Sequence, residues 1–219
     1  MAKRKTYDQE LHVHFVTFSC YRRRRLLDDD RAKRIVLGTM NSQLSLLTAR
    51  CIGFVIMPNH VHALLWFCQK GQLREFMQHW KRTSSSGIRS LFERVLTNYA
   101  QKVADSPVWQ AKYYGFNIFS SHKLEEKLDY MHQNPVRAGL VEQALDWRWS
   151  SARYYELGKS SQSGMDRITR TLSDRRVAPT LSRSLRDQAT RRAATSGRCA
   201  TLRRERQRFP ISPLVPAAP

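Results

Sequence analysis

Acidic residues are scarce in this sequence: 18 Asp and Glu stand against 38 Lys and Arg, which gives a formal net charge of +20. This imbalance excludes an acidic or charge-balanced surface and predicts attraction to polyanions. Nucleic acid is the first partner class to expect, and a membrane surface is the second.

Cysteine is also rare, and the sequence contains no Cys-x-x-Cys pair among its four cysteines. This pattern argues against both a zinc knuckle and a disulfide framework. No apolar run approaches the length of a membrane span, and no apolar stretch follows the charged residues 1–8. We therefore expect a cytoplasmic protein in a reducing compartment.

Aromatic residues become scarce towards the C-terminus. Residues 159–219 contain a single one, Phe209, together with 14 basic and 4 acidic residues. So little apolar surface does not offset the entropy of ordering the chain. We predict a folded domain over residues 1–158 and a disordered basic tail over 159–219, which either binds nucleic acid non-specifically or is an inert solvated extension.

The folded part shows alternating strand and helix patterns. β-branched and aromatic composition predicts strands at 11–20, 51–57, 60–67 and within 109–119, and helical periodicity predicts helices at 28–44 and from Leu73 onward. Residues 83–87, Thr-Ser-Ser-Ser-Gly, predict a break or kink in the second helix. The order predicts an α+β, ferredoxin-like split βαβ fold, with helices on one face of a four-stranded antiparallel sheet and the other face open.

A further helix is expected from its N-cap, Ser121, to about Asn134, where Pro135 should end it. Tyr130 and Asn134 are four residues apart, so they share one face of this helix. Residues 144–152 should close the domain, with Trp147 and Trp149 as packing anchors.

Two histidines one residue apart, His60 and His62, follow the turn residues Pro58 and Asn59. Strand side chains alternate between faces, so both imidazoles lie on the open face, while Val61, Ala63, Leu65 and Phe67 meet the helices. Together the two rings can hold one cation. A polar strand face is the alternative, because His-x-His alone is a weak motif.

The combination of two histidines, a tyrosine and an amide oxygen indicates phosphoryl chemistry. A tyrosyl oxygen can attack a phosphodiester and become covalently linked, which conserves the bond energy for rejoining. A phenol with a pKa of about 10 is a poor nucleophile at neutral pH without help. A divalent cation such as Mg²⁺ or Mn²⁺, bound by two imidazoles and one oxygen, supplies that help by polarising the phosphate.

The motifs Met57-Pro-Asn-His-Val-His62 and Asp129-Tyr-Met-His-Gln-Asn-Pro-Val136, with Trp109-Gln110 and Trp147-Arg-Trp-Ser-Ser151, resemble those of the HUH single-tyrosine transposases. The sequence is most similar to the REP-associated tyrosine transposases, which are related to the insertion-sequence-200 type. This likeness spans roughly residues 11–155, and the tail has no counterpart.

The resemblance implies a role for each matching position. His60, His62 and the Asn134 oxygen would bind the metal. Tyr130 would be the nucleophile that forms a 5′-phosphotyrosine on single-stranded DNA and frees a 3′-OH. Family members of this branch cleave and rejoin DNA at imperfect palindromes folded as hairpins. For this protein, the sequence leaves both a monomer and a homodimer open. The expected DNA contacts are Arg22, Arg23, Arg24, Arg25, Lys81, Arg82, Trp109 and Arg137.

Other readings of these residues remain open. The run Arg22–Arg25 is either a solvated loop or a phosphate contact. His12 and His14 form a second His-x-His, which we treat as a decoy, and we expect His132 to be a surface residue. The remaining tyrosines near the motifs should be structural: Tyr113, Tyr114, Tyr154 and Tyr155. A hairpin-binding module on the same fold, without catalysis, is the alternative to a DNA strand transferase.

Overall fold

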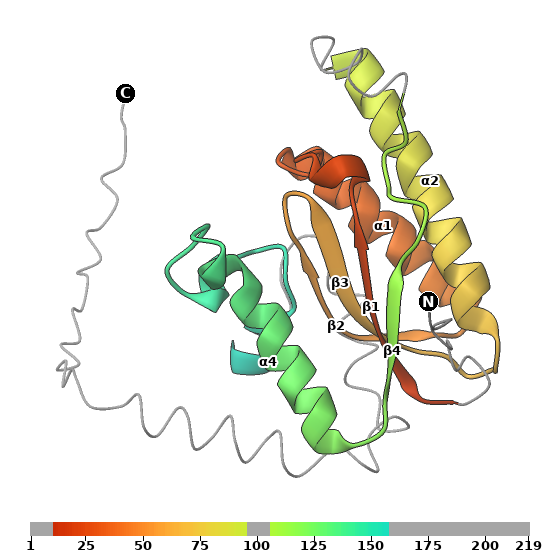
Figure 1. Ribbon diagram of the computed structural model, residues 1–219, viewed down its shortest axis with the longest axis vertical. Helices are drawn as coiled ribbons and strands as arrows, with labels where there is room; N and C mark the ends of the chain where they lie inside the picture. The colour runs from red at the N-terminus through yellow and green to blue at the C-terminus, as the bar shows by residue number, and fades with distance from the viewer. Residues whose placement is uncertain (1–10, 96–105, 158–219) are drawn as a thin grey trace, which may run out of the picture.

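A four-stranded antiparallel sheet forms the centre of the protein, whose computed structural model describes residues 11–95 and 106–157 (Figure 1). The elements in chain order are β1 Val13–Ser19, the 3-10 turn η1 Tyr21–Arg23, α1 Asp30–Leu46, β2 Arg50–Ile56, β3 His60–Trp66, α2 Gln72–Val95, β4 Tyr114–Ile118, α4 Ser121–Arg137, η2 Ala144–Asp146 and α5 Ala152–Leu157. The predicted basic tail, 159–219, lies outside the described residues.

The strands are ordered β2-β3-β1-β4, and all three pairings are antiparallel. β2 and β3 form the predicted hairpin, closed by a hydrogen bond of 2.8 Å from the Met57 amide to the His60 carbonyl. This strand order and the two helices that follow β1 and β3 confirm the ferredoxin-like arrangement. The central pair, β1 and β3, places Thr17 opposite His62 and Ser19 opposite His60.

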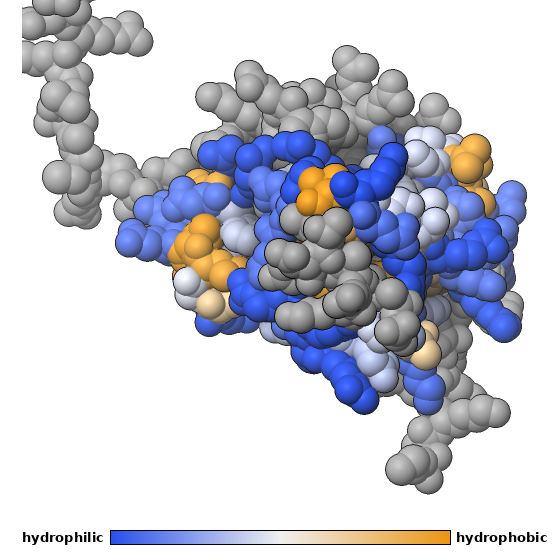
Figure 2. Space-filling view, turned by 90° about the horizontal axis from the view of Figure 1, so that it is seen from above, coloured by the Kyte–Doolittle hydropathy of each residue, from blue (hydrophilic) through white to orange (hydrophobic). Residues whose placement is uncertain are grey.

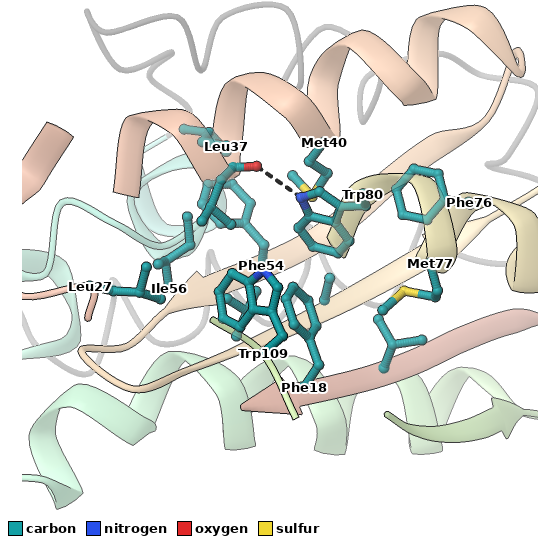
Figure 3. Close-up of a cluster of buried hydrophobic side chains, with 14 of the residues drawn as sticks. Phe18, Leu27, Leu37, Met40, Phe54, Ile56, Phe76, Met77, Trp80 and Trp109 are labelled. Carbon is teal, nitrogen blue, oxygen red and sulfur yellow. Dashed lines mark hydrogen bonds between the residues drawn. The ribbon is translucent and has the colours of Figure 1, made fainter. Parts of the chain in front are cut away.

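One face of the sheet packs against α1 and α2. Val61, Ala63, Leu65 and Phe67 all belong to this core, as the alternation in β3 predicts. Figure 3 shows its centre, where Trp80 of α2 packs beside Phe18 of β1 and donates its indole N–H to the Val36 carbonyl of α1 at 2.9 Å. Burying these large side chains is the main stabilising contribution to the fold.

The other face is not open, which corrects the prediction of a free sheet face. Helix α4 lies across it, on the side opposite α1 and α2 (Figure 1). A second apolar core forms there between the sheet and three α4 residues, Leu124, Leu128 and Met131. Gly53 of β2 permits the close approach, since a Cβ at that position would lie 2.5 Å from Leu128 Cδ2. The histidine face of the sheet is therefore a helix interface.

The predicted break in the second helix is wrong, because α2 continues through residues 83–87. Ser84 is fully buried, and its hydroxyl lies 2.6 Å from the Trp80 carbonyl and accepts the Trp109 indole N–H at 3.0 Å. Gly87 faces α1, where a Cβ would lie 2.8 Å from Ile35 Cγ2. Packing against α1 and Trp109 overrides the low helix propensity of this segment.

The last long helix also differs from the sequence prediction at both ends. Its N-cap is Ser120, whose hydroxyl accepts the Lys123 amide, and the helix runs past Pro135 to Arg137. Gly139, with a φ of +65°, provides the left-handed residue that ends it, and the Gly139 amide donates to the Val136 carbonyl. Asn134 therefore lies inside the last turn rather than at the terminus.

The segment after α4 returns to the edge of the sheet at β2. The Ile56 amide donates to the Trp149 carbonyl, and the Ser151 amide donates to the Phe54 carbonyl. Trp149 is 2% exposed in the main core, and Trp147 donates its indole N–H to the Ile56 carbonyl. The two tryptophans thus pack as predicted and hold this segment beside the strand that leads to the histidines.

The surface seen in Figure 2 is mostly hydrophilic among the coloured residues, with small separate apolar patches. Within residues 11–95 and 106–157, no helix is both long and apolar enough to cross a membrane.

Candidate metal and nucleophile site

His60 and His62 stand next to each other on the α4 side of β3. Their ring centroids are 4.8 Å apart. His60 is half-buried, whereas His62 is only 5% exposed, between Phe15 of β1 and Tyr130 of α4. The shared face is as predicted, but His62 does not stand in the open, because α4 covers it.

The Nδ1 atom of each imidazole is already engaged by a neighbouring side chain. The Asn59 Oδ1 atom lies 2.6 Å from His60 Nδ1 and can only accept, so His60 donates through Nδ1. Thr17 Oγ1 lies 2.6 Å from His62 Nδ1. Partners of this kind orient a metal-ligating imidazole and leave the lone pair on Nε2. The buried Nε2 of His62 has no hydrogen-bond partner within the described part of the chain.

Both imidazoles are held neutral well below physiological pH. Burial lowers the pKa of His60 to about 4, and the charge of Arg23 adds to the effect. Burial, followed by the charges of His60, Arg23 and Lys127, lowers the pKa of His62 to about 3. A neutral imidazole offers a lone pair to a cation, so this chemistry suits a metal ligand.

Tyr130 projects from α4 towards this pair. Its ring centroid is 5.6 Å from that of His62 and 6.3 Å from that of Phe15, and the side chain is 39% exposed. The ring is therefore neither buried in the apolar core of α4 nor on the far face of the sheet. Arg137, one of the predicted DNA contacts, lies over the Tyr130 ring at 5.4 Å from its centroid.

Asn134 lies one helical turn beyond Tyr130, and its amide nitrogen donates to the Tyr130 carbonyl at 2.9 Å. This bond leaves the side-chain oxygen as the atom with which Asn134 would hold a cation. Within residues 11–95 and 106–157, no group of three or more His, Cys, Asp or Glu residues could hold a metal. The donor set of two neutral imidazoles and one amide oxygen nevertheless fits a divalent cation, and the orphaned His62 Nε2 is the observation that favours it.

The four arginines after β1 are used in different ways. Arg22 and Arg23 are exposed in left-handed conformations, with φ of 53° and 57°. Arg24 donates to the Pro107 carbonyl at 2.6 Å, and Arg25 forms a two-pronged ion pair with Asp28. Within the described residues, the guanidinium groups of Arg22 and Arg23 form no hydrogen bond or ion pair, although that of Arg22 lies over the Tyr21 ring. Arg23 is near enough to lower both histidine pKa values.

A second basic region lies between α2 and residues 107–111, around an open pocket of about 320 Å³ that Lys81 and Arg82 help to line. Lys81 donates to the Gln110 and Ala111 carbonyls, and burial lowers its pKa. Trp109 is only 4% exposed, with its indole bonded to Ser84 in the main core (Figure 3). The prediction that Trp109 contacts DNA is therefore corrected, since a buried indole has no face for a base.

His132 is a further correction, because it is buried rather than on the surface. Its Nε2 lies 2.8 Å from Ser151 Oγ, which also accepts the Phe54 amide at 3.0 Å. The Ser151 hydroxyl thus links α4 to β2 at a position two residues beyond Tyr130. No local pattern predicts it, because the partner comes from the returning segment.

Two residues that the sequence analysis placed outside the site, His14 and Tyr155, make structural contacts. His14 points into the helix-covered core and bonds Asn117 at 3.0 Å, away from His60 and His62. Tyr155 is half-buried and donates its hydroxyl to the Ile52 carbonyl. Sequence reasoning missed Thr17 and Lys127, the second of which lies three residues before Tyr130 on the same helix face.

Burial of His132 predicts a pH-dependent stability. Burial lowers its pKa to about 4, whereas a histidine of the unfolded chain has a pKa near 6.5. Between these two pH values, the unfolded state therefore binds one more proton than the folded state. The stabilising contribution is complete above about pH 6.5 and is lost as the pH falls towards 4. Measured by urea unfolding in EDTA, His132→Gln should lose roughly 3 kcal/mol less than wild type between pH 7 and pH 4.

The control for this comparison is His122→Gln, which changes an exposed histidine at the start of the same helix. It should reproduce the wild-type pH dependence. An equally steep loss in His132→Gln would mean that burial of this imidazole does not contribute to the acid sensitivity.

The proteins that resemble this chain in sequence are transposases. The family model described as Transposase IS200 like matches residues 7–134. A Haemophilus influenzae protein, described as a candidate REP-associated tyrosine transposase, is 26% identical over 129 residues, which are 56% of this chain and 73% of that protein. A REP-associated tyrosine transposase of Escherichia coli is 23% identical over 103 residues, 45% of this chain and 51% of that protein.

Among solved structures, that of a REP-associated tyrosine transposase bound to a REP hairpin matches with a TM-score of 0.57 and 17% identity. The match covers 73% of this chain and 87% of that one, and it shows a common fold. The family model covers more than half of the sequence. The chain therefore belongs to the IS200-like transposase family.

Proposed function

We propose that this transposase cleaves and rejoins single-stranded DNA at hairpin-forming repeats, with Tyr130 as nucleophile and a divalent cation at His60, His62 and Asn134. One observation carries the proposal: the exposed Tyr130 ring lies 5.6 Å from His62, whose buried Nε2 has no partner among the described residues. This proximity of a tyrosine of α4 and an imidazole nitrogen of β3, far apart in the sequence, supports the proposal.

The reaction consists of two phosphoryl transfers. In the first, Tyr130 Oη attacks the phosphorus, the Oη–P bond forms, and the bond from phosphorus to the 3′-oxygen breaks. The phenol proton passes to solvent, the 3′-oxygen takes a proton from solvent, and the 5′-phosphate stays on the tyrosine. In the second, a 3′-OH of another DNA end attacks the same phosphorus and releases Tyr130.

The residues around Tyr130 supply orientation. Packing of Leu124, Leu128 and Met131 fixes α4 against the sheet, so Tyr130 approaches the phosphate from one direction. Asn59 accepts from His60 Nδ1 and so leaves the His60 Nε2 lone pair available, and Thr17 orients the His62 ring through Nδ1. A bound Mg²⁺ or Mn²⁺ would supply Lewis-acid polarisation of the phosphate.

The proposal that the protein recognises a DNA hairpin rests on its fold and its net charge rather than on the residues around Tyr130. The solved relative of the same fold is bound to a REP hairpin, and this chain is strongly basic. Exposed Arg22, Arg23, Arg82 and Arg137 are the side chains proposed to contact DNA phosphates.

Covalent capture of DNA tests the proposal. Hairpin oligonucleotides from palindromic repeats flanking the gene are incubated with the protein and Mn²⁺ or Mg²⁺, then run on a denaturing gel. Label at the 3′ end should become attached to the protein, whereas label at the 5′ end should be released, because Tyr130 retains the 5′-phosphate. EDTA should reduce the adduct to background.

Two results would contradict the proposed cleavage reaction. Attachment of 5′-end label would reverse the polarity of the cleavage. Tight, specific hairpin binding with no adduct in either metal would replace the transferase with the non-catalytic binding module.

A further inference from the structure

A lysine stands beside the proposed nucleophile. Lys127 lies three residues before Tyr130 on α4, and its ammonium nitrogen is 5.5 Å from the centroid of the Tyr130 ring. The same nitrogen is 5.6 Å from the centroid of Phe15 on β1. The ammonium thus lies against two aromatic rings that both contact His62.

The position of this charge is well defined. Phe15 is buried and stacked on His62, with ring centroids 5.5 Å apart and 17° between the planes. Glu126 holds the ammonium from the solvent side at 3.3 Å, and the Lys127 side chain is 23% exposed. Cation–π contacts with two rings further favour this placement.

Positive charges meet at the proposed site, where two lysines, Lys123 and Lys127, share the Glu126 carboxylate. Both imidazoles are neutral, and the third proposed ligand is an uncharged amide, so no ligand carboxylate offsets a divalent cation. Lys127 adds a positive charge that is felt at His62. Arg23, whose charge lowers the pKa of His60, adds another.

We propose that Lys127 is a further catalytic residue, which binds a non-bridging oxygen of the scissile phosphate beside Tyr130. This inference rests on the proposed strand-transfer function. As Tyr130 Oη bonds to phosphorus and the 3′-oxygen departs, the phosphoryl oxygens gain negative charge. The ammonium stabilises that charge while keeping all its protons, so proton balance is unchanged.

The matched control is Lys123, one turn earlier on the same helix. Its ammonium pairs with the same Glu126 at 2.7 Å, and its side chain is 37% exposed. Lys127→Met and Lys123→Met therefore remove equal charge from one helix and break the same kind of ion pair. A difference between them reports the position of Lys127 next to Tyr130 rather than net charge.

The first measurement is the rate of adduct formation on the hairpin substrate. Lys127→Met should slow it about 100-fold, Lys127→Arg should recover a large part of the rate, and Lys123→Met should change it less than about threefold. Hairpin affinity should fall by no more than about threefold in either methionine variant, because one phosphate contact is a small share of the interface.

The second measurement tests the contact without chemistry. In a Tyr130→Phe background, binding is compared for a hairpin with a normal phosphate and with a neutral methylphosphonate at the cleavage position. Neutralising the phosphate should weaken binding about fivefold more when Lys127 is present than in Lys127→Met. Additive losses from the two changes would overturn the phosphate contact.

The outcomes separate the two proposals. Normal adduct formation by Lys127→Met would reject the role of Lys127 and leave the strand transferase intact. No adduct in wild type, with the methylphosphonate coupling seen at one position of a phosphate scan, would reject cleavage and keep Lys127 as a phosphate ligand. No coupling at any scanned phosphate would reject the Lys127 contact.

Discussion

Tyr130→Phe is expected to abolish the covalent protein–DNA adduct, with a loss of at least about 10⁴-fold, while hairpin affinity stays within about twofold of wild type. The substitution removes only the attacking oxygen. Among the described residues the Tyr130 hydroxyl has no hydrogen-bond partner, whereas the ring keeps its contacts with His62, Phe15 and Lys127. The free energy of unfolding should therefore change by less than about 0.5 kcal/mol.

The control is Tyr155→Phe, which removes a hydroxyl that is buried and bonded to the Ile52 carbonyl. It should leave the adduct intact and lower the free energy of unfolding by about 1–2 kcal/mol, because a buried carbonyl loses its partner. The two variants thus have opposite expected effects on activity and stability. An adduct that survives in Tyr130→Phe would assign the nucleophile to another tyrosine, which peptide mapping of the adduct would identify.

The faces of the strands were predictable because the relevant signal is local. Side chains alternate from His60 to Phe67, and the structure places Val61, Ala63, Leu65 and Phe67 on one side and the imidazoles on the other, as the period of two requires. The element order likewise leaves few antiparallel topologies for four strands and two helices. The sequence therefore indicated both the sheet and the histidine pair.

The burial of the site was not predictable from these patterns. Whether His62 is exposed depends on where α4 packs, and that depends on distant residues such as Gly53, which leaves room for Leu128. His132 is buried because Ser151, from the returning segment, reaches it. Helical periodicity indicates which residues of α4 share a face, but it does not indicate what that face meets.

Tertiary contacts, rather than local helix propensity, determine the structure of residues 83–87. The Thr83-Ser-Ser-Ser-Gly87 run is weakly helical, yet the buried Ser84 hydroxyl bonds both the Trp80 carbonyl and the Trp109 indole. The same contact takes Trp109 out of the set of DNA-binding candidates. The hydrogen bond between Trp109 and Ser84 therefore bears on two wrong predictions, the helix break at residues 83–87 and the DNA contact of Trp109.

His62→Leu is expected to abolish Mn²⁺ binding and DNA cleavage while leaving the metal-free protein at least as stable as wild type. His62 buries an Nε2 atom with no partner in the described part of the chain, and such an atom carries a desolvation cost. Replacing it with an apolar side chain should raise the free energy of unfolding in EDTA by about 1 kcal/mol at pH 7. Thr17, half-buried at the sheet surface, loses a partner that water can replace.

The stability difference should grow as the pH falls. Burial lowers the pKa of His62 to about 3, so below about pH 6.5 the unfolded wild type takes up a proton that the folded protein does not. Wild type therefore loses stability on acidification, and leucine, which does not titrate, removes this part of the loss. Urea unfolding in EDTA at pH 7 and pH 5 measures the difference, and the thermal shift with added Mn²⁺ measures binding.

His14→Leu is the matched control, since His14 is also a buried histidine of a His-x-His strand motif. It bonds Asn117 on the opposite face of the sheet, so its loss should cost about 1–2 kcal/mol in EDTA and leave the Mn²⁺ shift unchanged. A stabilised His62→Leu that still binds Mn²⁺ would place the cation elsewhere. A destabilised His62→Leu would mean that His62 is kept for packing, because a ligand nitrogen without its metal should not stabilise the fold.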